Sequence, residues 1–237
     1  MRAFMSYQTA DKEIAARVAA ILEEFECTAF MAHEHIEVSG EWRLEILKEI
    51  EAADLFVPIL SANYYNSIWC KQESGIAAFR KMTVIPLSTD GEIPQGFIAH
   101  IQSTKIDPAA PRYADLLPGV AKHDASFVID KLVAKVGKSG SFRGAEANFE
   151  LILPYIGKAT RKQVVDLLNL STDNGQVCHA GLCATKYLPP LVKSHGKFMD
   201  KDKLTQLEGG ARPVQQGGLT RWERGWPERT SRIGANL

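Results

Sequence analysis

Residues 55–60 form a run of six apolar side chains, LFVPIL, with no polar position inside it. A strand with one face in water alternates apolar and polar residues, whereas a strand buried on both faces is apolar throughout, as in parallel sheets. Parallel strands are joined by crossover segments of a dozen or more residues, usually helices. The run therefore predicts an α/β fold in which helices precede and follow this strand.

The segments around this run alternate between strand and helix patterns. Further strand candidates are the short apolar segments at residues 3–5, 28–31, 83–87 and 103–106, the last as an edge strand. Apolar residues at helical spacing predict helices over residues 11–25, 41–52, 67–81 and 127–136. This order predicts a flavodoxin-like parallel sheet with helices on both faces. Residues 61–66 are expected to be a loop, and residues 88–122 are rich in Pro and Gly.

The chain divides into an α/β domain at residues 1–137, a linker at 138–148, a small helical domain at 149–208 and a flexible tail at 209–237. Gly and Ser at residues 137–141 indicate the linker. Thr160 and Gln163 fit a capping box before one helix, and residues 180–192 are a second helix candidate, interrupted by two prolines. The formal net charge is zero, but it is unevenly distributed. Residues 1–137 contain 13 basic and 19 acidic residues, and residues 138–237 contain 15 and 9.

Composition places the chain among ordinary globular proteins, at 45% hydrophobic and 24% charged residues. No run of about 18 apolar residues occurs, so we expect no membrane span. The first residues, MRAFMSY, have the pattern of a strand and a turn, so we expect no secretory signal. Four cysteines in 237 residues do not form a disulfide framework, so we expect a reduced, cytoplasmic protein.

Trp69 and Glu73 are four residues apart on the helix predicted after the apolar strand. Positions i and i+4 share a helix face, so the indole and the carboxylate point the same way. In open α/β sheets, ligands bind in the crevice outside the carboxyl ends of the strands, and this helix begins at that end. The pair is therefore a candidate site. The alternatives are an exposed Glu73 near a helix N-terminus and a Trp69 that packs in the core.

Several motifs in order resemble a TIR domain over about residues 1–137. These are Phe4-Met5-Ser6-Tyr7, Asp11, Trp42 after Gly40, Leu60-Ser61, Ser67-Ile68-Trp69-Cys70, Glu73 and Val84-Ile85-Pro86-Leu87. Residues 32–40 resemble the BB loop of that family. The C-terminal hundred residues resemble no family that we can name.

The resemblance implies an NAD-cleaving enzyme of the bacterial type in which Glu73 is the catalytic residue. NAD⁺ would be the substrate, with no metal and no cofactor, and nicotinamide would leave with linear or cyclic ADP-ribose as the other product. The residues expected to bind substrate are Trp69, Phe4, Ser6, Tyr7, Ile36 and Trp42. No basic residue follows Ser6-Tyr7 at the place where some members have arginine. The implied setting is antiphage defence.

Two alternatives have different functions. In the first, the protein is a non-enzymatic signalling scaffold that self-associates through the BB loop. In the second, the C-terminal unit binds an effector protein, a nucleic acid or a small signal to which the first domain responds. A plain helical accessory unit is favoured over a helix-turn-helix at this place, so we expect no nucleic-acid partner and no membrane partner. Cys178, His179, Cys183 and His195 do not have the spacing of a zinc site.

Overall fold

The computed structural model describes residues 1–31 and 42–210. Within them lies a parallel sheet in the order β2-β1-β3-β5-β6, with β4 also paired to β3. The strands are β1 Arg2–Ser6, β2 Thr28–Met31, β3 Leu55–Leu60, β4 Thr83–Val84, β5 Leu87–Ser88 and β6 Thr104–Lys105. If β4 and β5 are taken as one interrupted strand, this is the flavodoxin-like order, and the predicted fold class is confirmed.

The strand predicted over residues 83–87 is two short strands, which corrects that prediction. β4 pairs with the first half of β3 and β5 with its second half. Pro86 lies between them and has no backbone N–H to give to a ladder. Its carbonyl oxygen still accepts a hydrogen bond from the backbone of Thr104, at 2.9 Å, so the edge strand β6 remains attached.

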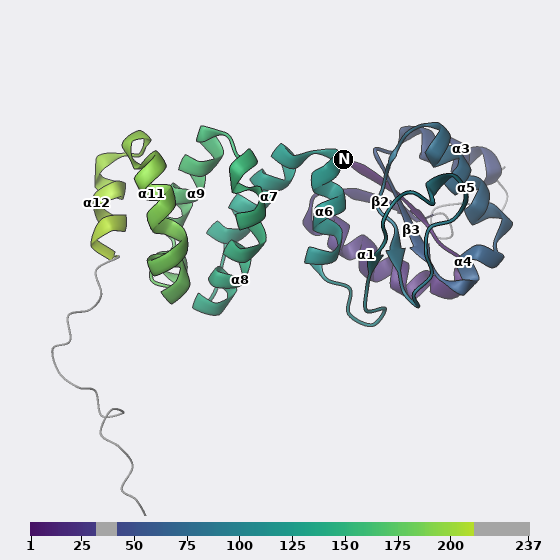
Figure 1. Ribbon diagram of the computed structural model, residues 1–237, viewed down its shortest axis with the longest axis horizontal. Coiled ribbons are helices and arrows are strands. Elements are labelled where there is room, and N and C mark those ends of the chain that lie inside the picture. Colours follow the sequence, from purple (N-terminus) through teal and green to yellow (C-terminus); the bar gives the residue numbers. More distant parts are fainter. Residues whose placement is uncertain (32–41, 211–237) are drawn as a thin grey trace, which may run out of the picture.

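Helices cover both faces of the sheet, as Figure 1 shows. They are α1 Lys12–Glu24, α3 Trp42–Ala52, α4 Ala62–Asn66, α5 Ile68–Phe79, α6 Tyr113–His123 and α7 Ala125–Gly137, with short 3-10 turns η1 Thr9–Asp11 and η2 Gly96–Ile98. Alternate residues of β3 face opposite sides: Leu55 and Val57 pack with α1 and α6, while Phe56 packs with α3 and α5. The apolar run is therefore a strand buried on both faces.

Two of these helices were not expected from sequence. Helix α4 occupies residues predicted to be a loop, and Ser61 caps its N-terminus by accepting the backbone N–H of Tyr64. Helix α6 lies in the Pro- and Gly-rich stretch and contains Pro118. Its start is fixed by Asp115, whose carboxylate accepts the backbone N–H of Arg112 at 2.8 Å. Capping and burial outweigh the unfavourable proline in this helix.

The C-terminal part consists of helices alone among the residues that are described. They are α8 Phe142–Ile152, η3 Leu153–Lys158, α9 Arg161–Asp173, α10 Gly175–Cys178, the π-helical turn η4 Cys183–Tyr187, α11 Leu188–His195, η5 Gly196–Phe198 and α12 Lys201–Gly210. In Figure 1 the longer ones stand side by side beyond α7, with α12 farthest from the sheet. We call α8 to α12 the helical unit.

Three expectations for this part have definite outcomes. The capping box of Thr160 and Gln163 is present at α9. The expected linker at residues 138–148 instead contains most of α8, whose N-cap is Ser141. The two prolines stand in the first turn of α11, directly after the π-helical turn η4, and the helix continues past them to His195. Residues 211–237, which include most of the expected tail, lie outside the described part.

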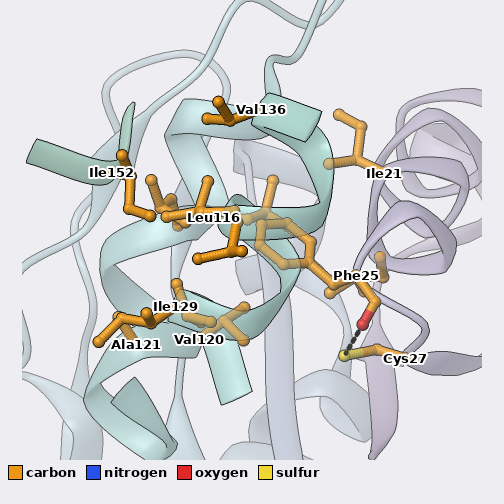
Figure 2. Packing of buried hydrophobic residues seen from close by; sticks show 14 of the residues in the cluster. Ile21, Phe25, Cys27, Leu116, Val120, Ala121, Ile129, Val136 and Ile152 are labelled. Carbon is orange, nitrogen blue, oxygen red and sulfur yellow. Dashed lines mark hydrogen bonds between the residues drawn. The ribbon is translucent and has the colours of Figure 1, made fainter. Parts of the chain in front are cut away.

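Helix α7 belongs to both parts of the chain. One continuous apolar cluster contains residues of α1, α6, α7, α8 and α9, and Figure 2 shows Phe25, Leu116, Ile129 and Ile152 from four of these regions packed together. On the sheet side, Lys135 donates to Glu24 at 2.9 Å. The apolar core therefore runs without interruption from the sheet into the helical unit.

Polar contacts also tie α7 to the helical unit. The amide of Gln163 on α9 donates to the carboxylate of Asp130 at 2.8 Å and to the backbone carbonyl of Ser126 at 3.0 Å. The amide of Asn174, just past α9, donates to the carbonyl oxygens of Gly137 and Ser139, both at 2.9 Å. Both ends of α7 are thus held by α9 and its C-cap residue Asn174.

Candidate active site

Glu73 lies in the second turn of α5 with its side chain turned toward the sheet. Ser67 begins this helix, and its hydroxyl accepts the backbone N–H of Cys70 at 3.3 Å. Only 7% of Glu73 is exposed. The alternative of an exposed helix residue is therefore wrong. A carboxyl group at this depth needs polar partners, because burying an unpaired charge is costly.

The partner of Glu73 is the last residue of β1. The hydroxyl of Ser6 donates to Oε2 of Glu73 at 2.5 Å. Ser6 Oγ also lies 3.1 Å from the hydroxyl of Tyr64, which donates to the backbone carbonyl of Cys70 at 3.1 Å and lies 2.7 Å from Oγ of Ser74. Three elements, β1, α4 and α5, therefore meet at one buried hydrogen-bonded cluster.

Burial raises the pKa of Glu73 from its usual 4.5 to about 7, and the hydrogen bond from Ser6 opposes this shift in part. Burial also raises the pKa of the Cys70 thiol, to about 11, so this cysteine stays protonated and is not a nucleophile at neutral pH. Glu73 is thus a carboxyl group that changes charge near neutral pH, which is a property of functional sites more often than of structural ones.

The position of this cluster in the sheet favours a binding role. β1 is hydrogen-bonded to β2 on one side and to β3 on the other, and the chain reverses its direction of winding between β1 and β3. In sheets of this order, ligands bind outside the carboxyl ends of the strands at that switch point. Ser6 is the carboxyl end of β1, and Ser61 follows the carboxyl end of β3. Glu73 is held at the switch point through Ser6.

Trp69 is not a core residue. It is 41% exposed, and its ring contacts that of Trp42, also 41% exposed, edge to face with centroids 4.2 Å apart. Trp69 lies at the start of α5 and Trp42 at the start of α3. Trp69 is one helical turn before Glu73. The sequence left two interpretations of Trp69, as an aromatic group that faces a ligand or as a core residue. Its exposure agrees with the first.

Two of the residues expected to bind substrate, Phe4 and Tyr7, pack in apolar clusters on opposite faces of the sheet. Phe4 is fully buried and stacks on Phe30 and Phe56, with centroid distances of 5.6 and 6.0 Å, so it is a core residue. Tyr7 packs in the apolar cluster on the other side of the sheet, with α1 and α6. Successive strand residues point to opposite faces, so Ser6 and Tyr7 diverge. Ile36 and the rest of the expected BB loop, residues 32–40, lie outside the described part.

Two residues of the cluster were missed from sequence. Tyr64 is on the short helix that was expected to be a loop, and Ser74 follows Glu73 on α5. Neither stands in a motif that indicates chemistry. The one available signal was that Ser74 lies about two turns beyond Ser67 on the same helix, and this is too general to single it out.

The described residues include no group of three or more His, Cys, Asp or Glu side chains that could hold a metal ion. No helix in the described ranges is long and apolar enough to cross a membrane. A cavity of about 300 Å³ in the helical unit is lined by Cys178, Leu188, Val192 and Leu207 among others. Whether the helical unit takes a signal stays a prediction.

A family model matches the part of the chain that carries the motifs. Residues 3–117 match the model of the TIR domain family. No curated protein matches the chain. A solved structure of a 2-deoxyribosyltransferase from Bacillus psychrosaccharolyticus is similar at 19% identity, covering 45% of this chain and 86% of that chain with a TM-score of 0.37. The segment from residue 3 to residue 117, which carries the sheet, Ser6 and Glu73, is a TIR domain.

Proposed function

We propose that this protein cleaves the bond between nicotinamide and ribose in NAD⁺, with Glu73 as the catalytic residue. The TIR family includes NAD-cleaving enzymes as well as signalling scaffolds. The observation that carries the proposal is the buried carboxyl group of Glu73, held by Ser6 at the switch point of the sheet beside an exposed pair of indoles. A structural role alone does not call for an ionisable group there.

The reaction requires chiefly a negatively charged group that the protein holds close to the ribose. The ring nitrogen of nicotinamide in NAD⁺ is already cationic, so it leaves with the bonding electron pair and needs no proton. Positive charge then develops on the ribose, and a carboxylate close to it stabilises that charge. Water adds at the ribose carbon and releases its proton to solvent, or a group of the same molecule adds and gives a cyclic product. Glu73 would supply the carboxylate, with no metal or cofactor in this scheme.

The raised pKa of Glu73 fits a cationic substrate. In the free protein, a pKa of about 7 leaves this group close to half protonated at neutral pH. A pyridinium ring or a developing cation next to it favours the ionised form and lowers its pKa. Substrate binding would therefore release a proton, and the negative charge would be fully present when the reaction requires it.

The indoles of Trp42 and Trp69 would provide the aromatic part of the site. Indole faces attract cations, with a contribution of roughly 0.5–2 kcal/mol depending on solvent exposure. The two rings meet edge to face, so at least one indole face is not occupied by the other ring. We therefore keep both residues as proposed contacts of the nicotinamide end of NAD⁺.

A second candidate function, a scaffold that assembles through this domain, is favoured by exposed apolar side chains. Phe79 at the end of α5 is 88% exposed, and Phe97 in η2 is 81% exposed. Ile68 and Leu44 add to them on α5 and α3. TIR domains self-associate in general. Assembly and catalysis are compatible, so the test of catalysis must be made on assembled protein.

The test compares the wild type with Glu73→Gln at high protein concentration and with a crowding agent. Nicotinamide release from NAD⁺ is measured by chromatography, and mass spectrometry identifies linear or cyclic ADP-ribose. We expect release by the wild type, none by Glu73→Gln, and wild-type release by the control Glu51→Gln, whose carboxylate is exposed on α3. Undiminished release by Glu73→Gln would rule out the catalytic assignment. No release by assembled wild type would favour the scaffold.

We further propose that this activity serves antiphage defence in the bacterial cytoplasm, with the helical unit as the part that receives an effector or a signal. Cells that express the wild type should lose NAD during phage infection and restrict phage growth. Cells that express Glu73→Gln at the same level should do neither. Protection that survives the substitution would separate defence from NAD cleavage.

A further inference from the structure

The cluster around Glu73 contains a residue that the proposed reaction does not use directly. Tyr64 is completely buried, on a helix of five residues between β3 and α5. Its ring packs with Leu60 and Cys70. Its hydroxyl lies within hydrogen-bond distance of three oxygen atoms, those of Ser6, Ser74 and the Cys70 carbonyl. One hydrogen-bond partner is enough to satisfy the hydroxyl proton of a buried tyrosine, so the presence of the other two oxygen atoms has to be explained.

We propose that Tyr64 is a positioning residue for Glu73, acting through Ser6. Its hydroxyl fixes the rotamer and the proton of the Ser6 side chain, so that Ser6 donates to Glu73 in the orientation that NAD cleavage uses. This inference rests on the function proposed above for Glu73. The hydroxyl of Tyr64 is linked by hydrogen bonds to the carboxyl group of Glu73 by way of Ser6.

Counting protons shows why the three hydroxyls form one chain. With Glu73 ionised, Ser6 gives its only proton to the carboxylate at 2.5 Å, which leaves Ser6 Oγ as an acceptor. Tyr64 can fill that place at 3.1 Å, and Ser74 can donate to Tyr64 at 2.7 Å. All three hydroxyls then point toward the negative charge. Each bond polarises the next, which strengthens the last one.

With Glu73 protonated, the same atoms support the opposite direction. The carboxyl group donates to Ser6, Ser6 donates to Tyr64, and Tyr64 donates to the carbonyl oxygen of Cys70 at 3.1 Å. The bond from Tyr64 to the Cys70 carbonyl is made in this direction alone, because the tyrosine has a single proton, which goes to Ser6 when Glu73 is ionised. The bonds to a charged acceptor are the stronger ones, so the chain favours the ionised form of Glu73 over the neutral form.

The helix that carries Tyr64 is itself anchored at the sheet. Ser61 accepts the backbone N–H of Tyr64 at 3.1 Å and donates to the buried carboxylate of Asp11 at 2.6 Å. Asn63 donates to the same carboxylate at 3.3 Å. The Tyr64 hydroxyl is therefore held relative to the ends of both β1 and β3, which is what a positioning role requires.

Few other charges act on this group within the described residues. The titratable neighbours of Glu73 in the cluster are Tyr64 and Cys70, and burial raises the pKa of both. β3, α4 and η2 contain no charged residue. The charged residue of β1, Arg2, is at the other end of that strand and pairs with Glu49 of α3 at 2.6 Å. Burial raises the pKa of Glu73, and the hydrogen bond from Ser6 lowers it.

Tyr64→Phe tests the proposal, because it removes the hydroxyl and keeps the ring. Tyr65→Phe is the matched control: it is the next residue of the same helix, and its hydroxyl donates to the Ile93 carbonyl, away from Glu73. The pKa of Glu73 is measured by NMR on protein with ¹³C-labelled glutamate, with Glu73→Gln to assign the signal. Circular dichroism checks that each variant is folded.

We expect Tyr64→Phe to raise the pKa of Glu73 by about half a unit to one unit, which corresponds to one hydrogen bond. Tyr65→Phe should leave it unchanged. In a Ser6→Ala background, Tyr64→Phe should add no further shift, since the path through Ser6 is already broken. Ser74→Ala should give a smaller shift of the same sign, and it tests the chain without altering the core should Tyr64→Phe fail to fold.

Two results would overturn the proposal: no shift in Tyr64→Phe relative to Tyr65→Phe, or an equal shift with and without Ser6. For the reaction itself, Tyr64→Phe should lower kcat by about three- to tenfold and move the acid limb of the pH profile upward, with KM for NAD⁺ little changed. The NMR titration needs no turnover. If the wild type cleaves no NAD⁺, the proposed function fails while the link from Tyr64 to Glu73 is still decided.

Discussion

Replacing Glu73 by glutamine exchanges a buried ionisable carboxyl group for a neutral amide of nearly the same shape. The amide oxygen can still accept the hydrogen bond that Ser6 donates at 2.5 Å. The chief change is therefore electrostatic. The wild-type protein must hold a charge at this depth above neutral pH, whereas the variant never does. Glu73→Gln should consequently be the more stable protein at high pH.

The magnitude follows from the pKa of Glu73. Its value is 4.5 for an ordinary carboxyl group and about 7 in the folded protein. The folded state binds the proton more tightly than the unfolded chain, so the free energy of unfolding falls as pH rises from 4.5 through 7 and is constant above that window. A difference of about 2.5 units at about 1.36 kcal/mol each gives about 3 kcal/mol.

The assay is urea denaturation of wild type and Glu73→Gln at pH 4.5 and pH 8. The difference in unfolding free energy between the two proteins should shift by about 3 kcal/mol in favour of Glu73→Gln between these pH values. The same comparison with Glu51→Gln, an exposed residue of α3, supplies the control for general effects of charge. A difference between wild type and Glu73→Gln that is the same at both pH values would refute the reasoning, because it would mean that burial does not oppose ionisation of this group.

Three further predictions concern activity, packing and domain structure. For the proposed NAD cleavage, kcat/KM should rise with pH and reach half its maximum near pH 7, the pKa of Glu73 in the free protein; a midpoint near 4.5 would contradict this. Gly119→Ala should destabilise the protein by roughly 1–3 kcal/mol, because its Cβ would lie 2.6 Å from Cγ2 of Ile85. Gly75→Ala, also in a helix but with nothing within 4 Å, should stabilise it by about 0.5–1 kcal/mol, and urea denaturation measures both. A fragment that ends at residue 137 should unfold at a lower temperature than the whole chain and aggregate, because it exposes the side of α7 that packs on α8 and α9; circular dichroism and light scattering test this, and equal stability would show that the sheet does not need the helical unit.

The fold class could be predicted because each strand and helix has a pattern of apolar residues that can be recognised in its own segment of the sequence. The apolar run of β3 and the helical periods around it depend only on neighbouring residues. The wrong predictions concern residues whose structural role depends on their caps and on burial by other elements. Pro118 argues against a helix by itself, yet α6 forms because Asp115 caps it and the sheet buries it. The Ser and Gly residues near 139 indicated a linker, but Ser141 is the cap of α8.

Part of the site could also be predicted, because one of its residues lies on a helix that the sequence pattern identifies. Glu73 could be placed near the carboxyl ends of the strands because the position of α5 in the strand–helix order fixes it. Its partner Ser6 was named, but as a contact of the substrate rather than of Glu73. Tyr64 could not be found, since its bond to Ser6 joins residues 58 positions apart and no local pattern encodes it. The opposite orientation of Tyr7 follows from strand alternation and could have been anticipated.

The sharing of α7 between the sheet and the helical unit has a consequence for synthesis on the ribosome. All strands of the sheet and both residues of the Ser6–Glu73 pair leave the ribosome before α9 does. Until then, the apolar side of α7 that later contacts α9 has no cover, and the polar groups of Asp130 and Gly137 lack the partners that α9 and its C-cap supply. A chain interrupted in this interval would carry every residue of the candidate site on an incompletely packed core. Completion of the helical unit therefore sets the moment at which a newly made molecule acquires its stable site.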